Sequence, residues 1–108
     1  MKVLKGILEE ELQNSIRMKS QYEKALNELP KGSLVEKTIK SHKYYYLAVR
    51  ERHKVKFIYK GKISEEEKRR YIETKKMRAK YRKLIFQLNK QIAFLEKAIN
   101  GKAIRSLS

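Results

Sequence analysis

Apolar side chains recur at seven-residue spacing in two long segments of the chain. In the first, positions 8, 12, 15, 19, 22, 26 and 29 alternate in steps of four and three, and carry Leu, Leu, Ser, Lys, Tyr, Leu and Leu. In the second, positions 81, 85, 88, 92, 95 and 99 carry Tyr, Ile, Leu, Ile, Leu and Ile. This spacing is typical of helices that pair as a coiled coil. It predicts helices over residues 6–29 and 64–100, the first with a weak seam at Ser15 and Lys19.

The residues around these segments indicate where each helix begins and ends. Pro30 stops the first helix, because proline lacks a backbone donor and restricts the residue before it. Ser64 is placed to cap the second helix, and Glu67 three residues later completes a capping box. Gly101 is a natural terminator, so residues 101–108 form a tail.

The insert between the helices changes to the two-residue alternation of β-strands. Three runs rich in β-branched and aromatic residues, 33–39, 43–50 and 54–60, predict a three-stranded antiparallel sheet within residues 33–60. We expect a turn near residues 41–43 and a three-residue turn at 51–53. This register opposes Val49 to Val55, Leu47 to Phe57 and Tyr45 to Tyr59 on one apolar face, joined by Val35 and Ile39, with Lys37 also pointing inward. The other face would carry Tyr44, Tyr46, Arg50, Lys54, Lys56 and Lys60.

The predicted fold class is therefore α+β, in a single domain over residues 1–108. It is an antiparallel two-helix coiled-coil hairpin with a small three-stranded antiparallel β-sheet inserted at its tip. The alternative for the long second helix is a dimeric coiled coil between two chains, and the two arrangements are compatible. A homodimer through the coiled coil is therefore one expected partner state.

Charge is concentrated in the middle of the chain. The net charge is +16, from 28 Lys and Arg residues against 12 Asp and Glu residues. Residues 1–29 are neutral, whereas residues 30–62 hold ten basic and two acidic side chains and residues 68–83 hold nine and one. A protein charged only for solubility would spread its lysines more evenly. The pattern favours a polyanionic partner.

The sequence offers little that could support catalysis. There is no cysteine and only two histidines, and no glycine-rich phosphate loop or nucleophile–base set stands out. We therefore expect a non-enzymatic protein with no metal site and no cofactor. No run of about 20 apolar residues suggests a membrane span, and no signal peptide is apparent, so we expect a cytoplasmic protein without a membrane partner.

Basic and aromatic residues together predict contact with nucleic acid, either DNA or RNA, or with a ribonucleoprotein. Lysine and arginine displace counterions from phosphates, and aromatic rings stack on bases. The candidate contacts are Tyr44, Tyr46, Arg50, Arg52, Lys54, Lys56 and Lys60 on the sheet, and Arg69, Lys76, Lys80 and Lys83 on one stripe of the second helix. The alternative for Tyr44 and Tyr46 is packing against that helix.

Residues 29–64, LPKGSLVEKTIKSHKYYYLAVRERHKVKFIYKGKIS, resemble a segment of small bacterial proteins of phage or mobile-element origin. The resemblance covers about a third of the chain and implies a role in mobile-element biology, without assigning a catalytic residue. Our leading hypothesis is a nucleic-acid-binding protein that uses the basic and aromatic sheet face and the adjacent basic helix. The alternative is an inhibitor or adaptor of a host nucleic-acid enzyme, similar to an anti-CRISPR protein that binds an effector or its guide RNA.

Overall fold

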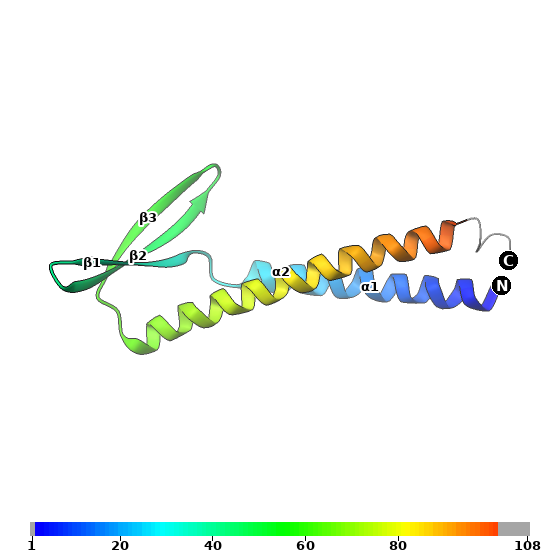
Figure 1. Ribbon diagram of the computed structural model, residues 1–108, viewed down its shortest axis with the longest axis horizontal. Coiled ribbons are helices and arrows are strands. Elements are labelled where there is room, and N and C mark those ends of the chain that lie inside the picture. The colour runs from blue at the N-terminus through cyan, green and yellow to red at the C-terminus, as the bar shows by residue number, and fades with distance from the viewer. Residues whose placement is uncertain (1, 102–108) are drawn as a thin grey trace. The chain divides into compact units, whose positions relative to one another are not determined.

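A computed structural model describes residues 2–101 of the 108-residue chain. Two helices, α1 (Lys2–Glu28) and α2 (Glu65–Asn100), enclose three strands in the sequence: β1 (Ser33–Ile39), β2 (His42–Glu51) and β3 (Lys54–Gly61) (Figure 1). The predicted α+β class, with the sheet inserted between the helices, is confirmed. The tail predicted for 101–108 lies outside the described residues, apart from Gly101. Within residues 2–101, neither helix contains a stretch that is both long and apolar enough to cross a membrane.

The chain divides into two compact units, which we describe in turn. One contains residues 2–28 and 79–101, and the other is Leu29–Arg78. The helix α2 belongs to both units, because it continues without a break across residues 78 and 79. The prediction that residues 1–108 form a single domain stays a prediction.

In the first unit, the predicted seams are the least exposed stripes of both helices. Every α1 position of the repeat from Leu8 to Leu26 and every α2 position from Tyr81 to Ile99 is buried or half-buried. The rings of Tyr22 and Tyr81 lie 5.9 Å apart, and farther along the unit Gln91 Nε2 donates to Ser15 Oγ at 2.7 Å. These two contacts connect the helices in antiparallel order, as Figure 1 also shows. Supercoiling of this pair, and pairing between two chains, stay predictions.

Ser15 interrupts the apolar seam without leaving a polar group unsatisfied. Its side chain is completely buried, and its hydroxyl accepts the Gln91 hydrogen bond. A buried hydroxyl without a partner would cost about 1–3 kcal/mol, so the Gln91 amide makes this residue tolerable in the seam. Leu88 and Leu95 supply the most deeply buried apolar side chains of the unit.

In the second unit, the strands follow one another in the order β1-β2-β3, all antiparallel. Ile39 pairs with His42 and Glu51 pairs with Lys54, so both turns have two residues. Lys40 and Ser41 have φ angles of 50° and 69°, as in the turns whose twist matches that of a hairpin. The first turn therefore begins one residue before the predicted region, 41–43, and shares Ser41 with it.

The predicted register between β2 and β3 is wrong by one residue. Val49 pairs with Lys56 and Leu47 with Ile58, whereas Tyr46, not Tyr45, pairs with Tyr59. The physical cause is the turn: Arg52 adopts a φ of 55°, which closes the hairpin with two residues in place of the three expected. Since side chains alternate strictly along a strand, a one-residue shift exchanges the two faces of β3.

The two-residue turn between β1 and β2 likewise exchanges the predicted faces of β1, so both outer strands differ from the prediction. Val55, Phe57 and Tyr59 share a face with Tyr44, Tyr46 and Arg50, which we call the aromatic face. Its β1 residues are Val35, Lys37 and Ile39, because these pair with Tyr46, Tyr44 and His42. The inward positions predicted for Val35, Lys37, Ile39, Val55, Phe57 and Tyr59 are therefore wrong.

The opposite face of the sheet, which carries Tyr45, contacts the first turns of α2. Tyr45 is buried, and its hydroxyl donates to Glu36 Oε1 at 2.9 Å. Lys68 Nζ lies 3.9 Å from the same carboxylate oxygen and 5.6 Å from the centre of the Tyr45 ring. The three consecutive tyrosines are therefore divided between the two faces of the sheet as predicted, with Tyr45 facing α2 and Tyr44 and Tyr46 on the opposite face.

The start of α2 and the entry to β1 are each fixed by a hydrogen bond. Ser64 Oγ accepts from the backbone N–H of Glu67 at 3.1 Å, which is the predicted N-cap. Arg78 donates to the carbonyl of Pro30 at 2.6 Å, so the segment that leaves α1 is tied to α2 within this unit.

Candidate nucleic-acid interface

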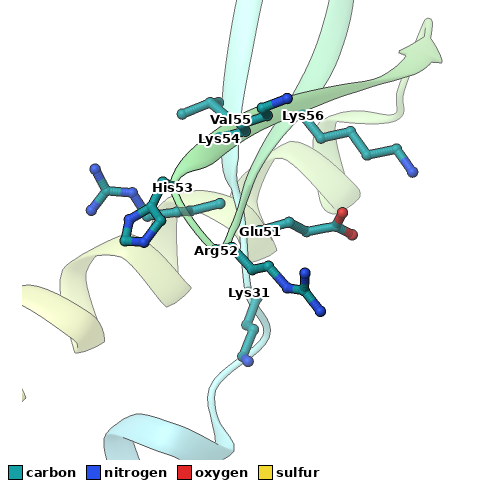
Figure 2. A pocket seen from close by; sticks show the side chains of 8 residues that line it. Lys31, Glu51, Arg52, His53, Lys54, Val55 and Lys56 are labelled. Atoms are coloured by element: carbon teal, nitrogen blue, oxygen red, sulfur yellow. The ribbon is translucent and has the colours of Figure 1, made fainter.

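Basic side chains converge at the tip of the β2–β3 hairpin. The two-residue turn and the cross-strand pairs next to it bring together Arg50, Arg52, Lys54 and Lys56, and the segment before β1 adds Lys31. We call these five residues the hairpin-tip cluster. With Glu51, His53 and Val55 they line an open hollow of about 1040 Å³. Figure 2 shows Lys31 beside the turn, with Arg52 and His53 projecting from it.

The positive charges of the hairpin-tip cluster are not neutralised locally. Within residues 2–101, the ion pairs shorter than 4.0 Å are Lys43–Glu36, Lys68–Glu36, Arg70–Glu66 and Lys76–Glu73, and none involves the cluster. Glu51 is the one carboxylate that lines the hollow. Five cations around one opening create a positive potential that attracts anions such as phosphate.

The aromatic face lies next to this cluster and is open. Phe57 and Tyr59 are 58% and 59% exposed. The rings of Tyr46 and Tyr59 are 5.3 Å apart, and Lys37 Nζ lies 5.2 Å from the centre of the Tyr46 ring. Tyr44, Tyr46, Tyr59 and Ile39 line a shallow depression of about 500 Å³. Because Tyr44 and Tyr46 lie on the face opposite Tyr45, they do not pack with Tyr45 against α2.

The register separates the sheet residues that the sequence grouped into one site. Tyr44, Tyr46 and Arg50 do share a face, but Lys54 and Lys56 lie on the Tyr45 face, because they pair with Glu51 and Val49. Lys60 is exposed and falls at the β-bulge, where β2 passes from Tyr46–Tyr59 to Tyr45–Gly61. The single mixed face of tyrosines and lysines is therefore a wrong prediction. In its place, the lysines meet the arginines at the hairpin tip.

The four candidates on α2 are all exposed. Arg69, Lys76, Lys80 and Lys83 follow one stripe of the helix at steps of seven, four and three. Lys76 lies 3.9 Å from Glu73, in an exposed pair of the kind that adds little to stability. The stripe thus offers positive charge to solvent along the helix.

Lys68 belongs to the packing between sheet and helix. Contact with the Tyr45 hydroxyl, reinforced by the Glu36 carboxylate, raises the pKa of Lys68. The same hydroxyl, followed by Lys43 and Lys68, lowers the pKa of Glu36 below its usual 4.5. Glu36 and Lys68, which both contact Tyr45, therefore stabilise each other's charged form.

Four residues that line the hollow are not among the contacts predicted from the sequence: Lys31, Glu51, His53 and Val55. The sequence predicts Glu51 and His53 only as turn residues and Val55 only on the apolar face. No local signal in the sequence places Lys31 at the hollow. It stands between Pro30 and Gly32, and Gly32, with a φ of 107°, turns the chain into the sheet. A side chain added at Gly32 would lie 2.8 Å from Leu47 Cδ1, so the backbone beside Lys31 packs directly on β2.

Among residues 2–101, no group of three or more His, Cys, Asp or Glu residues is placed to hold a metal ion. No protein-family model, curated protein or solved structure gives a significant match to this chain.

Proposed function

We propose that this chain is a non-enzymatic nucleic-acid-binding protein in which the hairpin-tip cluster holds phosphates. The observation that carries the proposal is the convergence of Lys31, two arginines and two lysines on one open hollow, with a single carboxylate among them. Each cation that meets a phosphate releases counterions from the nucleic acid, which gives affinity without base recognition.

The aromatic face supplies the second element of the proposed interface. Arg50 belongs to both, because it lines the hollow and pairs with Val55 beside Phe57. Tyr46 lies four residues before Arg50, about 13 Å along the strand. A nucleic-acid chain presents phosphates and bases side by side, so one ligand can meet both surfaces. The exposed stripe of α2 offers further phosphate contacts.

The test is a titration of binding against salt, with labelled single- and double-stranded DNA and RNA. If all five cations of the cluster meet phosphates, log K falls with log salt at a slope of about −3.5 for single strands and −4.5 for duplex DNA. Affinity then drops about 100- to 500-fold between about 50 and 200 mM salt.

A pair of variants locates the contact. Lys54→Gln with Lys56→Gln should weaken binding and reduce the slope by about 1.4–1.8, because two phosphate contacts are lost. The control, Lys24→Gln with Lys97→Gln, removes the same charge from exposed positions on the two helices and should leave the slope unchanged. Equal effects of the two variants, or binding that is insensitive to salt, would contradict the proposal.

The exposed apolar side chains favour a second candidate, a protein partner. Val55 and Phe57 are more than half exposed beside the basic cluster, and such patches are common at protein interfaces. In this case the chain would act as an inhibitor or adaptor of a host nucleic-acid enzyme, with its cations in an acidic groove or on a guide RNA. Capture of an enzyme of this kind that survives nuclease treatment, combined with no binding to free nucleic acid, would favour this candidate.

A further inference from the structure

We infer that the ligand of the aromatic face is single-stranded nucleic acid, whose unpaired bases stack on Tyr46, Phe57 and Tyr59. This inference rests on the proposed function and narrows its substrate class. It follows from the distribution of charge between the two faces, the arrangement of the rings, and the inaccessibility of base faces in a duplex.

The register sorts the charges of the strands by face. Both carboxylates of the strands, Glu36 and Glu51, lie on the Tyr45 face, where they pair with Tyr45 and Lys54. The aromatic face carries Lys37 and Arg50 but no carboxylate. A polyanion can therefore approach the rings without repulsion from the strands that bear them.

The rings are arranged as a surface and do not form a closed core. The Tyr46 and Tyr59 rings lie 5.3 Å apart and are inclined by 58°, and Phe57 lies two residues before Tyr59 on the same face of β3. Aromatic side chains that project from a sheet are used to stack unpaired bases, because every base presents a π-face. Lys37, at 5.2 Å from the Tyr46 ring, lies where it can meet a phosphate of the same strand.

Two other occupants fit this face less well. In a duplex the base faces are covered by their neighbours, so the rings would have nothing to stack on. A second copy of the chain would bring two sets of Lys37 and Arg50 into one apolar interface, with no carboxylate on either face to neutralise them. Burial of such unpaired charge opposes association.

The experiment compares affinities for single-stranded and duplex oligonucleotides of the same sequence, using the full chain. Phe57→Leu with Tyr59→Leu keeps apolar side chains but removes two rings. We expect a loss of roughly 5- to 150-fold for single strands for each ring that stacks a base, with the duplex affinity and the salt slope unchanged. The matched control is Phe94→Leu, since Phe94 is 68% exposed on α2. Phe57→Tyr, which retains a ring, should bind as the parent does.

Tyrosine fluorescence gives a direct second measurement, because the chain has seven tyrosines and no tryptophan. Stacking of bases on Tyr46 and Tyr59 should quench the emission on addition of single strands and not of duplex. Circular dichroism establishes that the variants are folded. Should the double variant lose its fold, Phe57→Leu alone supplies the same comparison, because the Phe57 side chain is mostly exposed.

The outcomes separate this inference from the proposed function. Equal affinity for both ligands, or a ring-deficient variant that binds single strands as well as the parent does, would overturn the inference while leaving a phosphate-binding hairpin tip intact. Absence of binding to any nucleic acid at low salt would overturn both. Self-association that Phe57→Leu abolishes, without single-strand selectivity, would assign the face to a second copy and also overturn the inference.

Discussion

The pairing of β2 with β3 can be tested by joining the two strands covalently. Val49 and Lys56 are direct cross-strand partners, and residues so paired have Cα atoms about 4.5–5.5 Å apart, within the range that a disulfide spans. The chain contains no cysteine, so the double substitution Val49→Cys with Lys56→Cys introduces the two thiols alone. We expect them to oxidise within the chain.

The size of the effect follows from the loop that the bond closes. Residues 49–56 form a loop of about eight residues, for which the chain-entropy relation gives a stabilisation of about 2.5 kcal/mol. For a chain of 108 residues, this corresponds to a rise in Tm of about 10 °C. Oxidised and reduced samples of the same variant are compared by thermal denaturation, so the loss of the Val49 side chain is common to both.

The control pair is Val49→Cys with Val55→Cys. Val55 pairs with Arg50 and so lies on the aromatic face, whereas Val49 lies on the Tyr45 face. Their Cβ atoms point apart, which prevents a disulfide without movement of the backbone. If this pair closes at low protein concentration, and the Val49–Lys56 pair does not, then the hairpin is shifted by one residue. The assignment of Phe57 and Tyr59 to the aromatic face would then be wrong.

Three further predictions concern stability. Replacing Lys40 and Ser41 by Asn and Gly should raise the free energy of unfolding by about 1–2 kcal/mol in chemical denaturation. Both residues have positive φ angles, a backbone conformation that is unfavourable for most residues but accessible to Asn and Gly. An unchanged midpoint would contradict this turn geometry. Ser64→Ala should cost about 1 kcal/mol in the same assay, through loss of the cap on α2, whereas Ser64→Asp should cost little. Because the Tyr45 hydroxyl lowers the pKa of Glu36, the ionised carboxylate stabilises the fold above its usual pKa of 4.5 and this contribution is lost as the pH falls through the lower folded value. The Tm of the parent should therefore decline more steeply on acidification than that of Glu36→Gln, and parallel curves would show that the carboxylate contributes nothing.

The helices could be predicted from the sequence because their signals are redundant. Each seam repeats over several turns, so one polar residue such as Ser15 does not obscure the pattern. The ends are marked independently by Pro30 and Ser64, whose effects on the backbone are local. The structure extends α1 back to Lys2, since no residue near the start of the chain opposes a helix strongly enough.

The register of the hairpin could not be predicted in the same way. The alternation along a strand indicates which residues share a face within β2 or within β3. It does not indicate which face of β3 lies on the same side of the sheet as a given face of β2, because that depends on the length of the turn. Grouping all apolar side chains on one face favoured a three-residue turn, whereas the left-handed conformation of Arg52 permits two. The clustering of basic residues at the hairpin tip does not depend on the length of the turn, because residues next to a turn remain neighbours in either register. The contribution of Lys31 depends on tertiary packing around Gly32 and has no counterpart in the local pattern.

The observed register leaves apolar surface in water that the alternative register would direct toward α2. Val55, Phe57 and Tyr59 are each more than half exposed, although full burial of such side chains stabilises a protein by about 1.5–3 kcal/mol each. The face that receives them lacks carboxylates, whereas the Tyr45 face holds both carboxylates of the strands. Packing of the sheet on α2, through Glu36, Tyr45 and Lys68, explains why carboxylates lie on the Tyr45 face. It does not explain why the aromatic face has exposed apolar side chains and no carboxylate. The proposed contact with an anionic ligand that has flat apolar groups would explain both the exposure of the rings and the absence of negative charge beside them.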